Sequence, residues 1–189
     1  MKINDMKKTL ILFSVAAAIG VFIISSTSCK KSSSSSPMTL YDSLGSTTLV
    51  SDPSTSGATI EKGRLAIRSV VDSTIFVIAG DTAINGHFTT LLAEVSAGNL
   101  TGFEALSKNL TDFVAVATGA KDYTYGGLSM ADAHNPATNP RMNGKADNSD
   151  FTEFENDLVT GANKNSVPSY LTARLGAIVE TLRTTVVQM

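Results

Sequence analysis

The 189-residue sequence has one cysteine and two histidines. A single cysteine excludes an intramolecular disulfide framework, and these few side chains also exclude a zinc site built from four cysteine and histidine ligands. Charged residues make up 17% of the chain, the formal net charge is −2, and no basic cluster is larger than the pair Lys30 and Lys31. A nucleic-acid partner is therefore not expected. With 42% hydrophobic residues, a chain of this length is expected to bury one core.

Motifs that carry common enzyme chemistry are also missing. The chain contains no Walker-type phosphate loop, no G-x-G-x-x-G, no G-x-S-x-G and no H-E-x-x-H. These absences argue against nucleotide binding, hydride transfer and the common hydrolase mechanisms. The carboxylates of Glu153, Glu155 and Asp157 have helical spacing, and this pattern predicts the solvated face of a helix. The chemistry is therefore expected to depend on the histidines, since imidazole can ligate a metal or shuttle a proton.

The first part of the chain has the pattern of an export signal. Lys7 and Lys8 precede an apolar run at 10–24, which has the length of a signal-peptide core and is short of the roughly 18 residues or more of a spanning helix. Small residues follow and end at Cys29, and this segment resembles the lipobox of bacterial lipoproteins.

This pattern predicts three regions: a signal peptide at 1–28, a lipidated Cys29 with a serine-rich tether at 29–39, and a domain at 40–189. The resemblance implies an exported protein that is attached to a membrane through its lipid. Because no acidic residue follows Cys29, it implies an outer-membrane lipoprotein on the periplasmic side of the cell envelope. The alternative is ordinary signal cleavage, which leaves Cys29 as a free thiol.

The remainder of the chain predicts an all-α fold. Apolar residues recur at three- and four-residue steps, which predicts helices over 67–78, 101–117, 150–158 and 168–186. Thr101 and Glu104 have capping-box spacing, and Gly119 is expected to end their helix. A short helical turn is predicted at 129–134, followed by a loop rich in Pro, Asn and Gly. No long segment alternates with period two, so no strand is expected.

One motif carries a specific resemblance. The segment at 123–134 reads Tyr-Thr-Tyr-Gly-Gly-Leu-Ser-Met-Ala-Asp-Ala-His, with Met130 and His134 on one face of a short helix. Read as Tyr-x-Gly-x-x-Met-x-x-x-His, it resembles the proximal segment of the truncated haemoglobins, in which that histidine binds haem iron. The segments Leu-Tyr-Asp-Ser-Leu-Gly at 40–45 and Ala-Ile-Arg-Ser-Val-Val-Asp at 66–72 resemble family segments in the same order. The resemblance covers roughly residues 40 to 187 and is best to the group I-like bacterial globins.

The resemblance implies a two-over-two helical sandwich around one haem b, with His134 as the only protein ligand to the iron. Phe88 falls where the family keeps a phenylalanine against the haem. Side chains expected to contact the cofactor are Phe88, Leu106, Leu110, Phe113, Tyr125, Met130 and Phe154. The apolar members of this set also fit ordinary core positions.

The side of the haem opposite His134 is expected to be apolar. Thr74 and Ile75 occupy the positions where the family usually has a tyrosine, and Leu110 aligns with its usual glutamine. Without that hydrogen-bond donor, oxygen retention is expected to weaken by roughly 1 to 3 kcal/mol, with little effect on carbon monoxide or nitric oxide. Thr74 or Asn109 would restore a donor if either side chain turned inward.

His87 has two interpretations, a sixth iron ligand or a surface histidine at a helix corner. The surface position is favoured, because the neighbouring Phe88 is the ring-packing residue and adjacent side chains point apart. Two insertions interrupt the family pattern, one between Gly45 and Ala66 and one between Phe88 and Leu106.

The implied function is a haem-binding globin, exported and membrane-tethered, that reversibly binds diatomic gases: oxygen, nitric oxide or carbon monoxide. One alternative is a haem enzyme, a nitric oxide dioxygenase or a peroxidase-like protein, which needs a reductant of unknown identity. The other is a helical interaction lipoprotein that has lost haem. An apolar distal side argues against dioxygenation, since that reaction needs retained oxygen.

Overall fold

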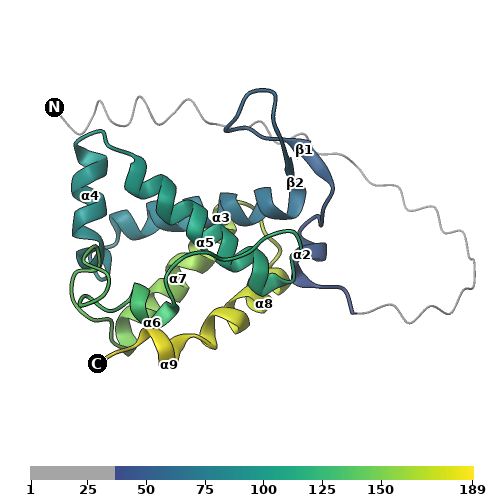
Figure 1. Cartoon of the computed structure of the whole chain (residues 1–189). Helices are drawn as coiled ribbons and strands as arrows, with labels where there is room; N and C mark the ends of the chain where they lie inside the picture. Colours follow the sequence, from purple (N-terminus) through teal and green to yellow (C-terminus); the bar gives the residue numbers. More distant parts are fainter. Residues whose placement is uncertain (1–36) are drawn as a thin grey trace, which may run out of the picture. The chain divides into compact units, whose positions relative to one another are not determined.

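Helices form most of residues 37–189. The computed structural model describes residues 37–189, so the predicted signal peptide and Cys29 lie outside the described residues. In chain order the elements are α2 (Leu40–Ser43), β1 (Leu49–Ser51), β2 (Thr59–Glu61), α3 (Lys62–Gly80), η2 (Asn85–Phe88), α4 (Thr89–Ser96), α5 (Thr101–Thr118), α6 (Met130–Ala133), α7 (Asn148–Lys164), α8 (Ser169–Glu180) and α9 (Arg183–Val186) (Figure 1). Within residues 37–189, every helix is too short or too polar to cross a bilayer.

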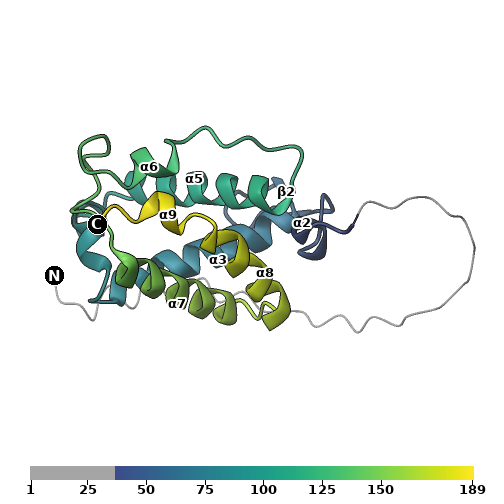
Figure 2. The same ribbon diagram turned by 90° about the horizontal axis from the view of Figure 1, so that it is seen from below.

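Helix α3 is the centre of the packing. It contacts α7 and α5 more extensively than any other pair of elements, while α8 lies against α7, α5 and α2 (Figures 1 and 2). The short helix α6 lies beside α9 (Figure 2). The apolar positions that predicted α3 are buried: Ile67, Val70, Val71, Ile75 and Ile78. The core therefore forms where the 3.6-residue period places it.

The approach of α3 to α7 depends on a glycine. A Cβ atom added to Gly161 would collide with the Thr74 hydroxyl and lie 2.9 Å from the Thr74 backbone nitrogen. The Asn165 amide further along donates to the Ser69 carbonyl at 3.1 Å and the Ser73 hydroxyl at 2.8 Å. The two helices are thus held together by backbone proximity and by polar contacts at the end of α7.

The ends of the helices match the predicted ends at some positions and differ at others. Gly119 ends α5 with φ of 105°, a left-handed conformation that glycine adopts without strain, as predicted. The prediction of a capping box at Thr101 was wrong, because the N-cap residue of α5 is Leu100, which makes no side-chain cap. The Asn99 side chain instead accepts a hydrogen bond from the Thr101 backbone nitrogen at 3.1 Å. A capping box does start α7, where Asp147 and Asp150 bond to each other's backbone nitrogens.

The prediction that no strand forms was wrong. Strands β1 and β2 pair antiparallel, with Leu49 opposite Glu61, inside the first predicted insertion. Asp52 follows β1 and forms an ion pair with Arg68 of α3 at 2.7 Å, which fastens the hairpin to the helical core. Each strand has three residues, and this is too short for an alternating pattern to be visible in the sequence.

Two helical segments also differ from the predicted ones. Helix α4 was not predicted and fills the second insertion, where Leu91 is its buried side chain. The helix predicted over 168–186 ends at Glu180, and α9 follows after two residues. The predicted turn at 129–134 is confirmed as α6, with Ser129 before it and His134 after it.

Candidate functional site

His134 is held at the end of α6 by local hydrogen bonds. The Ser129 hydroxyl accepts from the Asp132 backbone nitrogen at 3.1 Å and starts the helical turn. One turn later, the Nδ1 atom of His134 lies 2.8 Å from the Met130 carbonyl oxygen. A carbonyl can only accept, so Nδ1 carries the proton and donates it. Among residues 37–189, the other ring nitrogen, Nε2, has no hydrogen-bond partner.

Burial favours the neutral form of this imidazole. Desolvation lowers the pKa of His134 below its ordinary value of 6.5, the Met130 carbonyl raises it, and the nearby His87 lowers it. At neutral pH His134 is therefore uncharged, with its proton on Nδ1 and a lone pair on Nε2. This is the form of histidine that binds metals, and the hydrogen bond from Nδ1 to a carbonyl is the usual way to orient such a ligand.

The side chains that the resemblance places against a haem share an intermediate exposure. Leu106, Leu110 and Phe113 follow one another at helical spacing on α5, and all three are half-buried. The remaining four are half-buried as well: Phe88 at the end of η2, Tyr125 and Met130 before His134, and Phe154 on α7. Five of the seven, all but Tyr125 and Met130, pack against the buried core, so these five also fit ordinary core positions.

The segment before α6 is tied to α5 through two aromatic rings. The rings of Phe113 and Tyr125 meet edge to face, with centroids 5.4 Å apart. The Tyr125 hydroxyl donates to the Leu128 carbonyl at 2.6 Å, which fixes the ring relative to the turn that leads into α6. The structure therefore brings these two predicted contact residues together and places Met130 one turn from His134.

An enclosed cavity lies elsewhere in the described chain. It has a volume of about 30 Å³ and lies among α2, α3, α5, α7 and α8, with none of the seven predicted contact residues in its wall. A space of this size holds a water-sized molecule and no porphyrin. A haem would therefore need a site other than this cavity.

On α3, the residues expected on the distal side offer no free donor. The Thr74 hydroxyl donates to the Val70 carbonyl at 2.8 Å, and only 1% of the side chain is exposed. Ile75 is buried in the core, and Asn109 on α5 is exposed to solvent. Thr74 instead faces Gly161 of α7, and Ile75 lies in the helical core.

Both ring nitrogens of His87 have protein partners. Nδ1 donates to the Asn143 carbonyl at 2.8 Å, and Nε2 lies 3.1 Å from the Asp150 carboxylate. Arg141 of the same loop is paired with Glu94 of α4, at 2.9 Å between Nη1 and Oε1. His87 therefore serves here to anchor the loop after His134, and in this conformation it has no nitrogen free for a metal.

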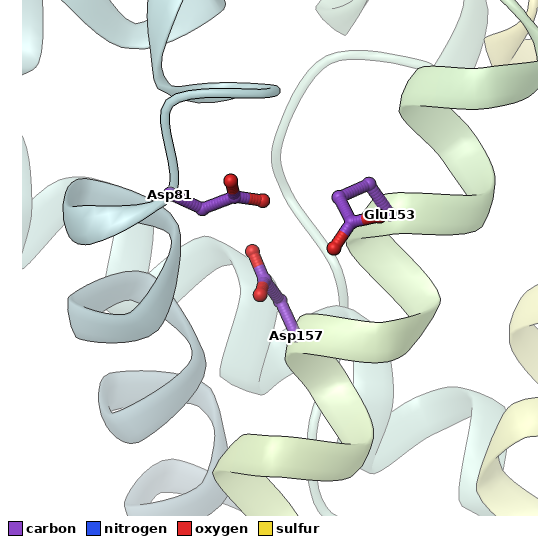
Figure 3. A group of neighbouring side chains, drawn as sticks. All are labelled: Asp81, Glu153 and Asp157. Carbon is purple, nitrogen blue, oxygen red and sulfur yellow. The ribbon is translucent and has the colours of Figure 1, made fainter.

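The prediction of a solvated face at Glu153 and Asp157 was wrong for Asp157. Only 5% of Asp157 is exposed, and with Glu153 and Asp81 it forms a group of three carboxylates (Figure 3). Reasoning from the sequence missed this acidic cluster, defined as Asp81, Glu153 and Asp157. The spacing on α7 was visible, but Asp81 is 72 residues before Glu153 and no pattern in the sequence joins them.

Comparison with known proteins adds no assignment, because no family model matches the chain and no curated protein is significantly similar to it in sequence.

Proposed function

We propose that residues 40–189 form a truncated-globin domain that binds haem b through Nε2 of His134 and reversibly binds a diatomic gas. The observation that carries the proposal is the state of His134. Its Nδ1–H is fixed on the Met130 carbonyl at 2.8 Å, and burial keeps the ring neutral. An imidazole suits iron as a ligand, and bound haem would supply an open coordination position for the gas.

The order of the helices supports this fold. A two-over-two sandwich needs two pairs of helices, which α3, α5, α7 and α8 would provide, with a short helix before the iron ligand. Helix α3 packs on both α5 and α7, and α6 ends at His134. The motif Tyr-x-Gly-x-x-Met-x-x-x-His begins in the connection from α5, continues through α6 and ends at His134.

The chain's own side chains would set the selectivity for the gas. Leu106, Leu110 and Phe113 would cover the cofactor and exclude water from the gas-binding side. Because the Thr74 hydroxyl is already bonded to the Val70 carbonyl at 2.8 Å, bound oxygen would receive no hydrogen bond from it. Oxygen would therefore dissociate faster than from a globin with a distal tyrosine, while carbon monoxide and nitric oxide would be retained. Reversible gas binding fits these residues better than nitric oxide dioxygenation.

We also propose that the domain acts outside the cytoplasm, tethered through a lipid on Cys29 to the outer membrane and facing the periplasm. Its partners would then be the dissolved gas, the membrane and a reductant for the iron. This part of the proposal depends on the sequence pattern at 10–36 alone.

The test is the absorption spectrum of the full chain after titration with haemin and reduction. We expect an intense Soret band at one haem per chain. His134→Gly should lose this spectrum and regain it when free imidazole is added, because imidazole can occupy the position of the missing ring. His87→Ala is the matched control and should keep the spectrum of the parent chain.

Two results would overturn the proposal. A Soret spectrum that is unchanged by His134→Gly would exclude His134 as the ligand. The absence of a specific band in the parent chain would exclude haem binding and would favour the helical interaction lipoprotein instead.

A further inference from the structure

The acidic cluster joins two helices at one point. Asp81 follows the last residue of α3, and Glu153 and Asp157 lie one turn apart on α7. The three carboxylates point toward one another (Figure 3), and one oxygen from each lies within 4.8 Å of the others. Like charges at this spacing on a helix repel each other, so the arrangement needs a compensating interaction.

The described residues supply little compensation. The Asp157 side chain is 5% exposed, and its Oδ2 atom is buried without a hydrogen-bond partner. Asp81 has the same feature, because Oδ1 accepts from the Ala83 backbone nitrogen at 2.9 Å while Oδ2 is buried and unpartnered. Within residues 37–189, none of the three carboxylates forms an ion pair with a lysine, arginine or histidine.

The backbone increases the negative potential at this point. Asp81 lies at the carboxyl end of α3, where unpaired carbonyl groups carry partial negative charge. The last turn of α3 contains no basic residue to offset it. A carboxylate buried in such a place destabilises the fold unless it takes up a proton or meets a cation.

Asp81 and Asp157 each have a buried oxygen without a hydrogen-bond partner, and both carboxylates point toward Glu153 (Figure 3). A bound cation would satisfy the buried oxygens of Asp81 and Asp157 together.

We propose that the acidic cluster binds a Ca²⁺ ion, which links the end of α3 to α7. The donor set consists of oxygen atoms only, which suits hard divalent cations rather than zinc or copper. Calcium binds oxygen at about 2.3–2.6 Å, so opposite ligands are about 4.6–5.2 Å apart. The oxygens of Asp81, Glu153 and Asp157 lie within 4.8 Å of one another, which is close enough for all three to bind one calcium ion, with water completing the coordination. The site is independent of haem, because it uses none of the residues around His134.

The experiment compares calcium binding by the full chain and by two variants, each freed of metal with EDTA and then dialysed. We expect calorimetric titration with CaCl₂ to give one site per chain. At a calcium concentration 100 times the Kd, the Tm should rise by about 5–10 °C. Asp157→Asn should lose the binding heat and the rise in Tm. Asp122→Asn, at an exposed loop position, should keep both.

The outcomes separate the alternatives. The proposal would be overturned if neither CaCl₂ nor MgCl₂ gave binding heat and the Asp157→Asn chain were more stable than the parent chain in EDTA. The cluster would then be a strained group of carboxylates without a cation. Tighter binding of Mg²⁺ than of Ca²⁺, with the same dependence on Asp157, would overturn the assignment to calcium. If Asp157→Asn does not fold by circular dichroism, Glu153→Gln takes its place, and calcium binding equal to the parent chain would again overturn the site.

Discussion

Replacement of Gly161 by alanine tests the close approach of α3 and α7. The added Cβ would meet the Thr74 hydroxyl and lie 2.9 Å from the Thr74 backbone nitrogen and 3.1 Å from its Cα. Two of these three neighbours are backbone atoms of a long helix, which cannot rotate away as a side chain can. Helix α3 and helix α7 would therefore have to move apart by several tenths of an ångström.

The matched control is Gly176→Ala on α8, where an added Cβ finds no atom within 4 Å. Both glycines lie inside helices, so each substitution gains about 1 kcal/mol of helix propensity. Overpacking of a tight contact costs about 1–3 kcal/mol, and the backbone neighbours at Gly161 favour the upper part of this range. We therefore expect Gly161→Ala to be less stable than Gly176→Ala by about 2–3 kcal/mol.

Urea denaturation of the two variants and the parent chain measures this difference. Gly176→Ala should unfold at higher urea than the parent chain, Gly161→Ala should unfold at lower urea, and the m-values should stay equal. Equal stabilisation by both substitutions would refute the reasoning, because it would mean that α3 and α7 leave room for a Cβ atom at Gly161.

Two further substitutions test individual side-chain interactions by urea denaturation. Asp147→Ala removes the side chain that accepts from the Asp150 backbone nitrogen at 2.9 Å and should lower the free energy of unfolding by about 1 kcal/mol. Asp147→Asn keeps an acceptor and should lower it much less. An equal loss for both variants would contradict the role of Asp147 as a helix cap. Asp52→Asn removes the ion pair with Arg68 at 2.7 Å and should cost about 1–2 kcal/mol at pH 7. Hydrogen bonding to Arg68 holds the pKa of Asp52 below its ordinary 3.8, so this stability is present above pH 3.8 and is lost as the pH falls further. The difference between the two chains should shrink below that pH, and a difference independent of pH would contradict the assignment.

Local signals in the sequence explain the long helices and the short helix α6 that ends at His134. The apolar period that starts at Ile67 predicts a helix that buries the same residues in α3. Ser129 and His134 delimit α6 because a hydroxyl cap and an i−4 hydrogen bond act within six residues. These interactions need no distant partner, so residue type and spacing are sufficient to predict them.

Non-local pairing could not be predicted in this way. The hairpin of β1 and β2 depends on pairing between two segments of three residues each, and Arg68 of α3 adds a contact 16 residues from Asp52. His87 contacts Asp150 at 3.1 Å, although the two residues are far apart in the chain. The pattern of residues along the chain does not show which distant side chains come into contact.

The sequence by itself determined where the long helices form, which of their faces are apolar, and which histidine ends a short helical turn. Only the tertiary structure decided that the Thr74 hydroxyl faces Gly161 and not a ligand, and that Asp157 is buried beside Asp81. The physical reason is that helical periodicity fixes the position of Asp157 on α7 but does not determine whether that position faces water or the end of α3. Burial is set by the neighbouring element, and for Asp157 that neighbour turns an ordinary polar position into a candidate calcium site.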